Sequence, residues 1–169
     1  MNEQAFNKDF VTLIGENKRI IFKIANAYCR NKNDREDLAQ DIIYQLWRSW
    51  STYNAAYTFS TWLYRIALNV AISFYRKKKH LSNTISFNNS VMEMEDKNEY
   101  PAEMESNIEL LQQFIRELKE LDKALIILHL EGKTYKEIAD ILGITETNVA
   151  TKLSRIKDKL KHKFLLIKQ

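Results

Sequence analysis

The near absence of glycine and proline limits the fold of this chain more than any other feature of its sequence. The 169 residues include three Gly and one Pro, which are Gly15, Gly132, Gly143 and Pro101. These residue types punctuate turns and end helices, and none of the four interrupts a long periodic segment. The sequence therefore predicts an all-α protein with few tight turns.

Composition excludes several classes of protein. Hydrophobic residues make up 45% of the chain, yet no apolar run approaches the roughly 18 residues that a membrane-spanning helix needs. We therefore expect a soluble, globular protein with no membrane insertion. The N-terminal residues lack the charged-then-apolar order of a secretory signal. A single cysteine, Cys29, cannot form an internal disulfide, so we predict a cytoplasmic protein with Cys29 in its core.

The sequence offers no candidate for a metal or catalytic site. His80, His129 and His162 are scattered, without the spacing of metal ligands. The carboxylates of residues 34–41 have no His or Lys positioned by the sequence to complete an active site. We therefore predict no metal, no cofactor and no enzymatic activity.

Charge is segregated along the chain. The formal net charge is +4, with positive residues gathered in 76–80 and 152–163 and negative residues in 34–41 and 93–109. A solvated surface is the ordinary explanation for any single charge run. Together, the runs indicate two basic surfaces for nucleic acid and an acidic surface for a basic partner.

Residues 59–80 read as one helix with two faces of different character. An apolar stripe that predicts a core contact consists of Leu63, Ala67, Val70 and Phe74. A second stripe, away from the first, consists of Trp62, Arg65, Asn69 and Arg76. Aromatic rings interleaved with cations are typical of surfaces that bind single-stranded nucleic acid, because bases stack on rings while cations neutralise phosphates. The alternative is a solvated helix with one half-buried Trp.

The residues before this helix predict three more helices and an aromatic loop. Helices are expected over 6–14, 18–30 and 35–50, the last capped by Asn33 or Asp34. The third helix is expected to bury Leu38, Ile42, Ile43, Leu46 and Trp47. Its exposed side is expected to carry Asp34, Glu36, Asp37, Gln40 and Asp41. A polar loop follows, and Ser60 or Thr61 is expected to cap the helix over 59–80. The aromatic side chains of this loop are expected to be exposed: Trp50, Tyr53, Tyr57 and Phe59.

A change in composition divides the chain. Residues 81–106 are enriched in Ser and Asn, have acidic character, contain the single Pro and show no sustained helical period. Structureless segments of this length are rare inside compact domains. We therefore predict a flexible linker between two small helical domains, residues 1–80 and residues 107–169.

The second domain contains a helix-turn-helix pattern. Asp122, Thr134 and Thr145 are candidate caps, and Gly143 permits a tight turn between a short helix over 135–142 and a long final helix. The expected inner packing is Ile138, Leu142, Ile144 and Val149. The core stripe of the final helix is expected to be Val149, Leu153, Ile156 and Leu160. Its opposite face carries short polar side chains and one Arg, which suit base edges in a major groove. A helical hairpin with a polar face is the alternative.

With both halves analysed, the chain resembles the sigma-70 family of bacterial RNA polymerase sigma factors, specifically the extracytoplasmic-function (ECF) type. DREDLAQDIIYQLW (34–47) resembles family region 2.2, and FSTWLYRIALNVA (59–71) resembles region 2.3 running into 2.4. YKEIADILGITETNVATKLSRIKDKL (135–160) is similar to region 4.2. Three blocks in the family order are far more specific than any one alone.

The resemblance implies a role for each block. Residues expected to bind core RNA polymerase are Asp37, Gln40, Asp41 and Gln45. Residues expected to capture the melted minus 10 element of promoter DNA are Trp62, Tyr64, Arg65, Asn69, Arg76 and Lys77. Residues expected to read the minus 35 element as duplex are Thr147, Asn148, Ala150, Thr151, Lys152, Ser154 and Arg155. The family resemblance also implies an anti-sigma factor as a partner.

Two departures from the family pattern bear on sequence preference. Ala150 stands where many members carry a basic residue, and Ser73 and Phe74 stand where an Asp is common. Two other functions remain open at this point. A stand-alone helix-turn-helix regulator would bind duplex DNA without polymerase, and an adaptor or anti-termination protein would use only the polymerase contact.

Overall fold

The structure is a computed structural model that describes residues 3–82 and 102–168. Within these residues the chain forms seven α-helices and a short 3-10 helix, with no strand, so the predicted all-α fold is confirmed. The elements are α1 (Glu3–Tyr28), α2 (Lys32–Ser49), η1 (Trp50–Thr52), α3 (Phe59–Ser82), α4 (Ala102–Arg116), α5 (Glu120–Leu130), α6 (Tyr135–Leu142) and α7 (Glu146–Ile167). They divide into two compact units, Met1–Phe87 and Asn88–Gln169.

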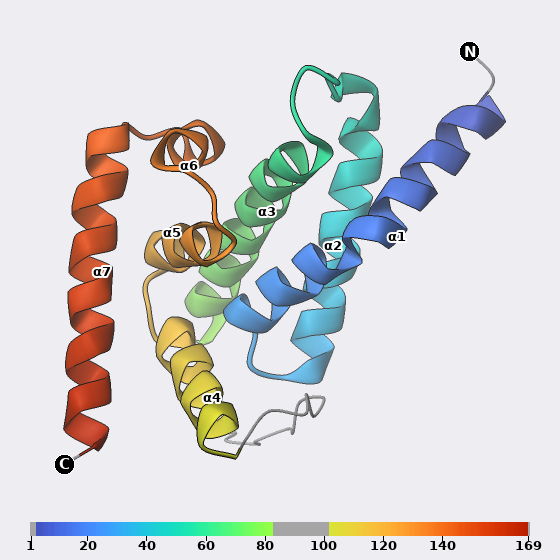
Figure 1. Cartoon of the computed structure of the whole chain (residues 1–169). Coiled ribbons are helices and arrows are strands. Elements are labelled where there is room, and N and C mark those ends of the chain that lie inside the picture. Colours follow the sequence, from blue (N-terminus) through green and yellow to red (C-terminus); the bar gives the residue numbers. More distant parts are fainter. Residues whose placement is uncertain (1–2, 83–101, 169) are drawn as a thin grey trace. The chain divides into compact units, whose positions relative to one another are not determined.

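In the first unit, α1, α2 and α3 all pack against one another (Figure 1). Each helix contributes aliphatic residues at helical spacing to a shared core, including Ile24 of α1, Leu38 and Ile42 of α2, and Leu63 of α3, all fully buried. Removing such side chains from water is the main favourable term in holding the bundle together. Cys29 lies in this core as predicted, at 5% exposure.

The helix boundaries of the first unit differ from the sequence prediction at three points. The two predicted N-terminal helices form one helix, α1, which runs through Gly15. A glycine inside a helix costs only about 1 kcal/mol relative to Ala, which the packing of α1 against two neighbours offsets. The cap of α2 is Asn31 rather than Asn33 or Asp34, because the Asn31 Oδ1 accepts a 2.8 Å hydrogen bond from the backbone N–H of Asp34.

The start of α3 also differs. Thr58, not Ser60 or Thr61, receives the first N–H groups of the helix: its carbonyl accepts from Thr61 at 3.1 Å and from Trp62 at 3.3 Å. The Thr58 hydroxyl lies 2.9 Å from that of Thr61. The residue whose carbonyl accepts the first helical hydrogen bonds precedes the first helical residue, which places the cap at Thr58, one residue before Phe59.

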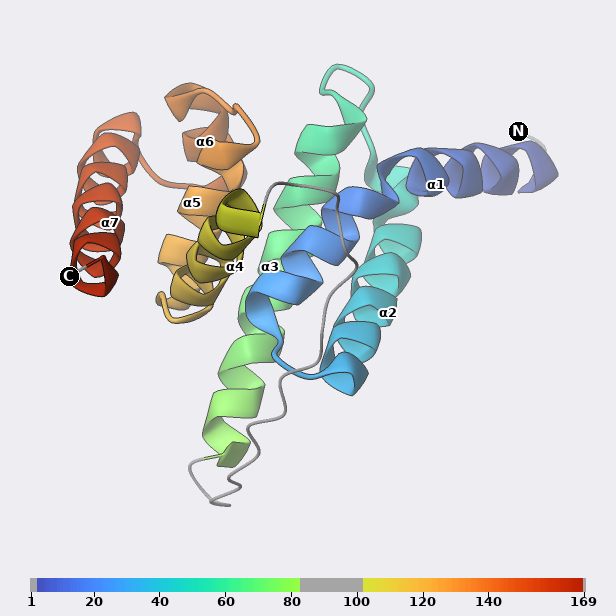
Figure 2. The same cartoon turned by 60° about the horizontal axis from the view of Figure 1, so that its bottom comes forward.

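In the second unit, α7 packs against α4, α5 and α6 (Figure 2). The predicted core stripe of α7, Val149, Leu153, Ile156 and Leu160, is buried throughout. In α6, Ile138 and Ile141 are buried, whereas the predicted core residues Leu142 and Ile144 are half-buried. Glu117, which directly follows α4, pairs with Lys163 of α7.

The capping of the helix-turn-helix follows the prediction closely. Thr134 and Glu137 form a reciprocal capping box at the start of α6, and Thr145 caps α7 through a 3.2 Å bond from the N–H of Asn148. Gly143 ends α6 with φ 68°, a left-handed conformation that glycine adopts without strain. For α5 the prediction of Asp122 is wrong, because the helix begins at Glu120 with Lys119 at the cap position.

The predicted linker lies mostly outside the described residues. Its first two residues belong to α3, and α4 begins at Ala102, five residues before the predicted start of the second domain. The predicted domain limits at residues 80 and 107 stay predictions.

Candidate nucleic-acid and polymerase-binding surfaces

A cluster of aromatic rings underlies the loop before α3. Trp50, 8% exposed, is its centre. Its ring centroid lies 5.4 Å from Phe10, 5.4 Å from Tyr53, 6.1 Å from Phe59 and 5.9 Å from Trp62. Tyr53 stacks on Trp50 with an interplanar angle of 11°, and the other three rings meet it edge-on. Such arrangements favour the ring quadrupoles and stabilise the junction of α1, η1 and α3.

The expectation that the loop aromatics are exposed is therefore wrong for two of the four. Trp50 and Phe59 are buried and Tyr53 is half-buried, whereas Tyr57 is 57% exposed. Sequence alone does not show that a polar loop folds its rings back onto the bundle, because no helical or strand period links these positions.

The predicted DNA-binding face of α3 is accessible. Arg65, Asn69, Arg76 and Lys77 are exposed, and Trp62 is half-buried with one side against the aromatic cluster. Tyr64 is the exception, at 2% exposure. It falls between the fully buried Leu63 and Ala67 on the packed side of the helix, so its ring does not reach the face that Asn69 occupies. Tyr64 thus belongs to the core in this structure, and we do not assign it a DNA contact.

The core stripe of α3 is also wider than the sequence suggested. Leu63 and Ala67 are buried as expected, but Val70 and Phe74 are half-buried, and Leu68 and Ala71 complete the packed face.

An ion pair joins the basic run to the start of α2. The Lys78 ammonium lies 2.5 Å from the Asp34 carboxylate and 5.8 Å from the centroid of the Phe74 ring. The same carboxylate accepts a 2.9 Å bond from the Asn31 side-chain amide. Asp34 and Lys78 therefore hold the end of α3 on α2, and we leave both out of the binding surfaces.

The predicted polymerase-binding residues share one accessible side of α2. Asp37, Gln40 and Asp41 are exposed. Gln45 is half-buried and its amide lies 3.4 Å from the Ser49 hydroxyl. No residue with positive charge occurs among residues 36–47, so this side of α2 favours a cationic partner.

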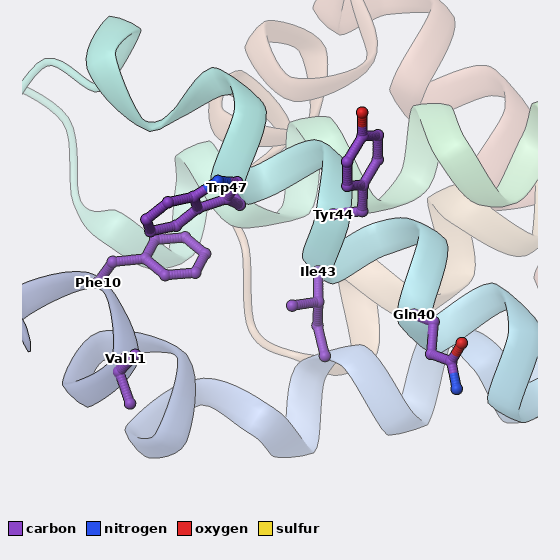
Figure 3. A pocket seen from close by; sticks show the side chains of 6 residues that line it. All are labelled: Phe10, Val11, Gln40, Ile43, Tyr44 and Trp47. Atoms are coloured by element: carbon purple, nitrogen blue, oxygen red, sulfur yellow. The ribbon is translucent and has the colours of Figure 1, made fainter. Parts of the chain in front are cut away.

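An open apolar groove of about 460 Å³ lies beside these residues, between α1 and α2. Its walls are Phe10 and Val11 of α1 and Gln40, Ile43, Tyr44 and Trp47 of α2 (Figure 3). The Phe10 and Trp47 rings meet edge to face at 5.2 Å. The prediction that Ile43 and Trp47 are core residues is wrong, since they are 39% and 43% exposed. The apolar face of α2 is broader than the strip that α1 and α3 cover, and the surplus lines the groove.

The outer face of α7 matches the predicted reading face. Thr147, Asn148, Thr151, Ser154 and Arg155 are exposed, and Ala150 and Lys152 are half-buried at its margins. The fully buried Val149 and Leu153 fix this orientation from the other side of the helix. All seven side chains thus lie on or beside one helix face that begins at the capped N-terminus of α7.

No group of His, Cys, Asp and Glu side chains in the described part of the chain could hold a metal ion. Among the described helices, none is long and apolar enough to cross a membrane.

Comparison with known proteins decides the family. The family model for Sigma-70 region 2 matches residues 13–81, and the family model for Sigma-70, region 4 matches residues 108–160. The RNA polymerase sigma factor YlaC of Bacillus subtilis is 31% identical over 129 residues, which span 75% of each chain. The chain belongs to the sigma-70 family of RNA polymerase sigma factors. RNA polymerase sigma factor SigV of the same organism is 29% identical to this sigma factor over 86% of its chain and 84% of SigV.

Solved structures agree on the fold. The sigma factor RpoE of Bartonella quintana, in complex with the anti-sigma factor NepR, has a TM-score of 0.76 at 20% identity and covers 92% of this sigma factor and 96% of its own chain. CnrH in complex with the cytosolic domain of CnrY has a TM-score of 0.64 at 18% identity, over 96% and 89% of the two chains.

This sigma factor is of the ECF type and directs promoter-specific transcription initiation. The sigma factors to which it is related are initiation factors and not enzymes in the usual sense. The match to region 2 over residues 13–81 disfavours a stand-alone helix-turn-helix regulator, whose first half would have another fold.

Proposed function

We propose that core RNA polymerase binds the exposed side of α2 through Asp37, Gln40, Asp41 and Gln45, together with the adjacent apolar groove. Gln40 belongs to both, so the polar residues and the groove form one continuous surface. Carboxylates that lie beside an apolar groove suit a partner helix that carries basic residues next to large apolar ones. Apolar burial would supply most of the affinity, and the charges would set the orientation.

We assign capture of the melted minus 10 strand to the exposed face of α3. Asn69 offers an amide that can donate and accept on the edge of an extruded base. Trp62 offers one ring face, while its other side rests on the aromatic cluster. Arg65, Arg76 and Lys77 supply positive charge for the phosphates of the same strand. Extruding a base costs a few kcal/mol, and stacking and hydrogen bonding together can offset that cost.

We assign recognition of the minus 35 duplex to the N-terminal half of α7. Thr147, Asn148, Thr151 and Ser154 are short enough to let the helix approach base edges, and Arg155 can bind a guanine through two hydrogen bonds. Lys152 lies at the margin, where it can reach a phosphate. Ala150 offers only a methyl group, which favours contact with thymine.

We further propose that an anti-sigma factor regulates this protein in the cytoplasm. Two proteins of similar fold, RpoE and CnrH, were solved with anti-sigma factor NepR and with CnrY. An exposed apolar groove on a free sigma factor is a surface that such a partner could cover. The proposed activity consists of binding, so we expect no enzymatic reaction, metal or cofactor.

The observation that carries this proposal is that Asn69 on α3 and the polar outer face of α7 are both exposed. Reconstitution with core polymerase, followed by transcription of genomic fragments, tests it. We expect transcripts from a limited set of start sites that depend on the added protein. Binding to the same fragments without polymerase, and no specific transcript with it, would support a stand-alone regulator instead.

A further inference from the structure

The basic residues at the end of α3, residues 76–80, point in different directions. Successive residues of an α-helix are about 100° apart, so Arg76 lies on the same side of α3 as Asn69, and Lys78 lies on the opposite side. That opposite side is the packed one, and it carries the fully buried Ala71. Lys78 therefore continues the packed side of α3 at the point where the core ends.

Lys78 meets a carboxylate at this place. Its ammonium lies 2.5 Å from Oδ1 of Asp34, in the first turn of α2, and 5.8 Å from the centroid of the Phe74 ring. The other carboxylate oxygen, Oδ2, accepts a 2.9 Å hydrogen bond from the Asn31 side-chain amide. The Asp34 side chain is 21% exposed, against 50% for Lys78. Asp34 is thus held by the cap of α2, and it directs Lys78 toward α2.

The ion pair changes what this end of α3 offers to DNA. Sequence-independent binding to DNA comes from cations that neutralise phosphates. An ammonium group that is paired with a carboxylate adds little to this attraction, because the two charges cancel at a distance. Lys77, the neighbouring residue, is exposed and points about 100° away from Lys78. Of these two neighbours, Lys77 is suited to bind a phosphate and Lys78 is not.

We propose that Asp34 is a specificity-determining residue, which holds Lys78 against α2 and so keeps one cation of the basic run away from phosphate. The inference rests on the proposed binding of DNA by the exposed face of α3. In a promoter complex, Asn69 fixes which side of α3 faces the DNA, and Lys78 is on the far side. On any other DNA no base contact fixes that side, so a released Lys78 can reach a phosphate. Asp34 therefore weakens binding to non-promoter DNA more than binding to promoters.

Stability of the fold does not require this pair. Ion pairs with exposed members add little to stability, and the cap of α2 is formed by the bond from the Asp34 N–H to the Asn31 side chain. Lys78→Gln leaves that cap and its bonds in place. We therefore expect Lys78→Gln to keep the thermal midpoint of the wild type, so that its DNA binding can be read without a folding defect.

The test uses core polymerase saturated with each sigma variant, which is the holoenzyme. Its affinity is measured for a promoter found by start-site mapping and for non-promoter duplex of equal length, over a series of KCl concentrations. Each phosphate contact changes the slope of log K against log[KCl] by about 0.7 to 0.9, which is about fivefold to eightfold in affinity for a tenfold change in salt. Lys77→Gln should make the slope shallower by this amount. Lys78→Gln should leave the slope unchanged on both DNAs.

Asp34→Asn releases Lys78 and should act in the opposite direction. Its binding to non-promoter DNA should tighten by about fivefold to eightfold at about 0.1 M KCl, with a steeper slope. Promoter affinity should change little, so the ratio of promoter to non-promoter affinity should fall. Adding Lys78→Gln to Asp34→Asn should restore the wild-type ratio, because no released cation remains. Asp34→Glu keeps the carboxylate and should behave as wild type.

Glu36→Gln is the matched control for net charge. It lies in the same helix, makes the same change of charge as Asp34→Asn, and breaks an exposed pair with Lys32, whose Nζ lies 3.9 Å from the Glu36 carboxylate. Both members of that pair are more than half exposed, so their charges are already screened by water and salt. Glu36→Gln should therefore change non-promoter affinity by less than about twofold.

The outcomes separate this inference from the proposed function. A slope for Lys78→Gln as shallow as that for Lys77→Gln would mean that Lys78 binds phosphate in the native protein, which overturns the inference while the sigma function stands. Equal tightening by Asp34→Asn and Glu36→Gln would reduce the effect to net charge and would also overturn it. An unchanged slope for Lys77→Gln would instead remove phosphate binding from the end of α3, and with it the proposed role on which the inference rests.

Discussion

Asn69 and Trp62 share a face of α3 but differ in what supports them. Asn69 is exposed, so truncating it removes functional groups without disturbing the core. Trp62 contacts Trp50, Tyr53 and Phe59, so truncating it would also loosen the loop. Asn69 is therefore the cleaner probe of minus 10 capture.

We expect Asn69→Ala to make the free energy of open-complex formation less favourable by about 1–3 kcal/mol, because the captured base edge would lose its hydrogen-bond partner. Affinity for core polymerase and the thermal midpoint should not change. Permanganate reactivity of unpaired thymines measures opening, and fluorescence anisotropy measures core binding. Phe22→Ala, a change at an exposed position of α1 outside the assigned surfaces, is the control. Equal opening by Asn69→Ala and Phe22→Ala would exclude the assigned role.

Arg155 is the side chain on the outer face of α7 best suited to base recognition. If its guanidinium binds a guanine, Arg155→Ala should weaken recognition of the preferred minus 35 sequence by about 1–3 kcal/mol and relax preference at one position. Lys159 is exposed and lies nearer the end of α7. Lys159→Ala should instead weaken DNA affinity equally on all sequences and make the salt dependence of that affinity shallower. Competition binding with single-base variants measures both. A uniform loss for Arg155→Ala would make it a phosphate contact.

At the scale of the helix, α6 depends on its capping box. The backbone N–H of Thr134 donates to the Glu137 carboxylate at 2.8 Å and the Glu137 N–H donates back to the Thr134 hydroxyl at 3.2 Å. The bond from the Thr134 backbone is the main reason that the pKa of Glu137 is lowered, and the Thr134 hydroxyl and nearby Lys133 act in the same direction. A lowered carboxyl pKa means that this stabilisation is present above the unfolded pKa of about 4.3 and is lost as the pH falls through the folded value.

Thr134→Ala should therefore destabilise the second unit by about 1 kcal/mol at pH 7. The difference from wild type should shrink as the pH falls below about 4, because protonated Glu137 no longer supports the box. Thermal unfolding at a series of pH values measures this. Lys136→Ala, an exposed change in the same helix, should stay within about 0.5 kcal/mol of wild type. A difference that is constant with pH would show that the Thr134 hydroxyl does not contribute to the lowered pKa of Glu137.

The groove on α2 gives a prediction that a sequence pattern alone would not have made. Tyr44 is 63% exposed and lines the groove, so Tyr44→Ala should leave folding intact. If polymerase fills the groove, its affinity for this variant should fall by about tenfold or more, as for a ring at the centre of an interface. Titration of labelled protein with core polymerase measures this, with Phe22→Ala as the control for loss of an exposed ring. Unchanged affinity would confine the polymerase contact to the polar residues.

Helix existence was predictable because periodicity and caps are local. Thr134, Gly143 and Thr145 each satisfy backbone groups within a few residues, so the helix-turn-helix could be derived from the sequence. The extent to which a neighbour covers an apolar face is not local. For that reason the sequence predicts Trp47 in the core and Tyr64 at the surface, and both predictions are wrong. The width of the apolar face on each helix depends on how the three helices pack.

At the scale of the whole molecule, the division into two units was predictable from composition, and the assigned surfaces fall within one unit or the other. Residues 83–101, which contain most of the predicted linker, lie outside the described residues. The family resemblance supplied the roles, since helix-turn-helix and aromatic-basic patterns name classes of ligand rather than partners. The sequence did not predict the groove, because its lining residues do not form a continuous stripe of one residue type.

The two DNA surfaces belong to different compact units, which predicts how their losses combine. Sites that share no contacts usually give additive changes in free energy, within about 0.5 kcal/mol. The free energy of open-complex formation should therefore change in the double variant Asn69→Ala with Arg155→Ala by the sum of the two single changes. The cycle is measured on one promoter at one salt concentration, because phosphate contacts make every affinity depend on salt. A coupling energy above about 1 kcal/mol, in either direction, would mean that minus 35 binding changes the state of α3, and that the two units act on the promoter as one device.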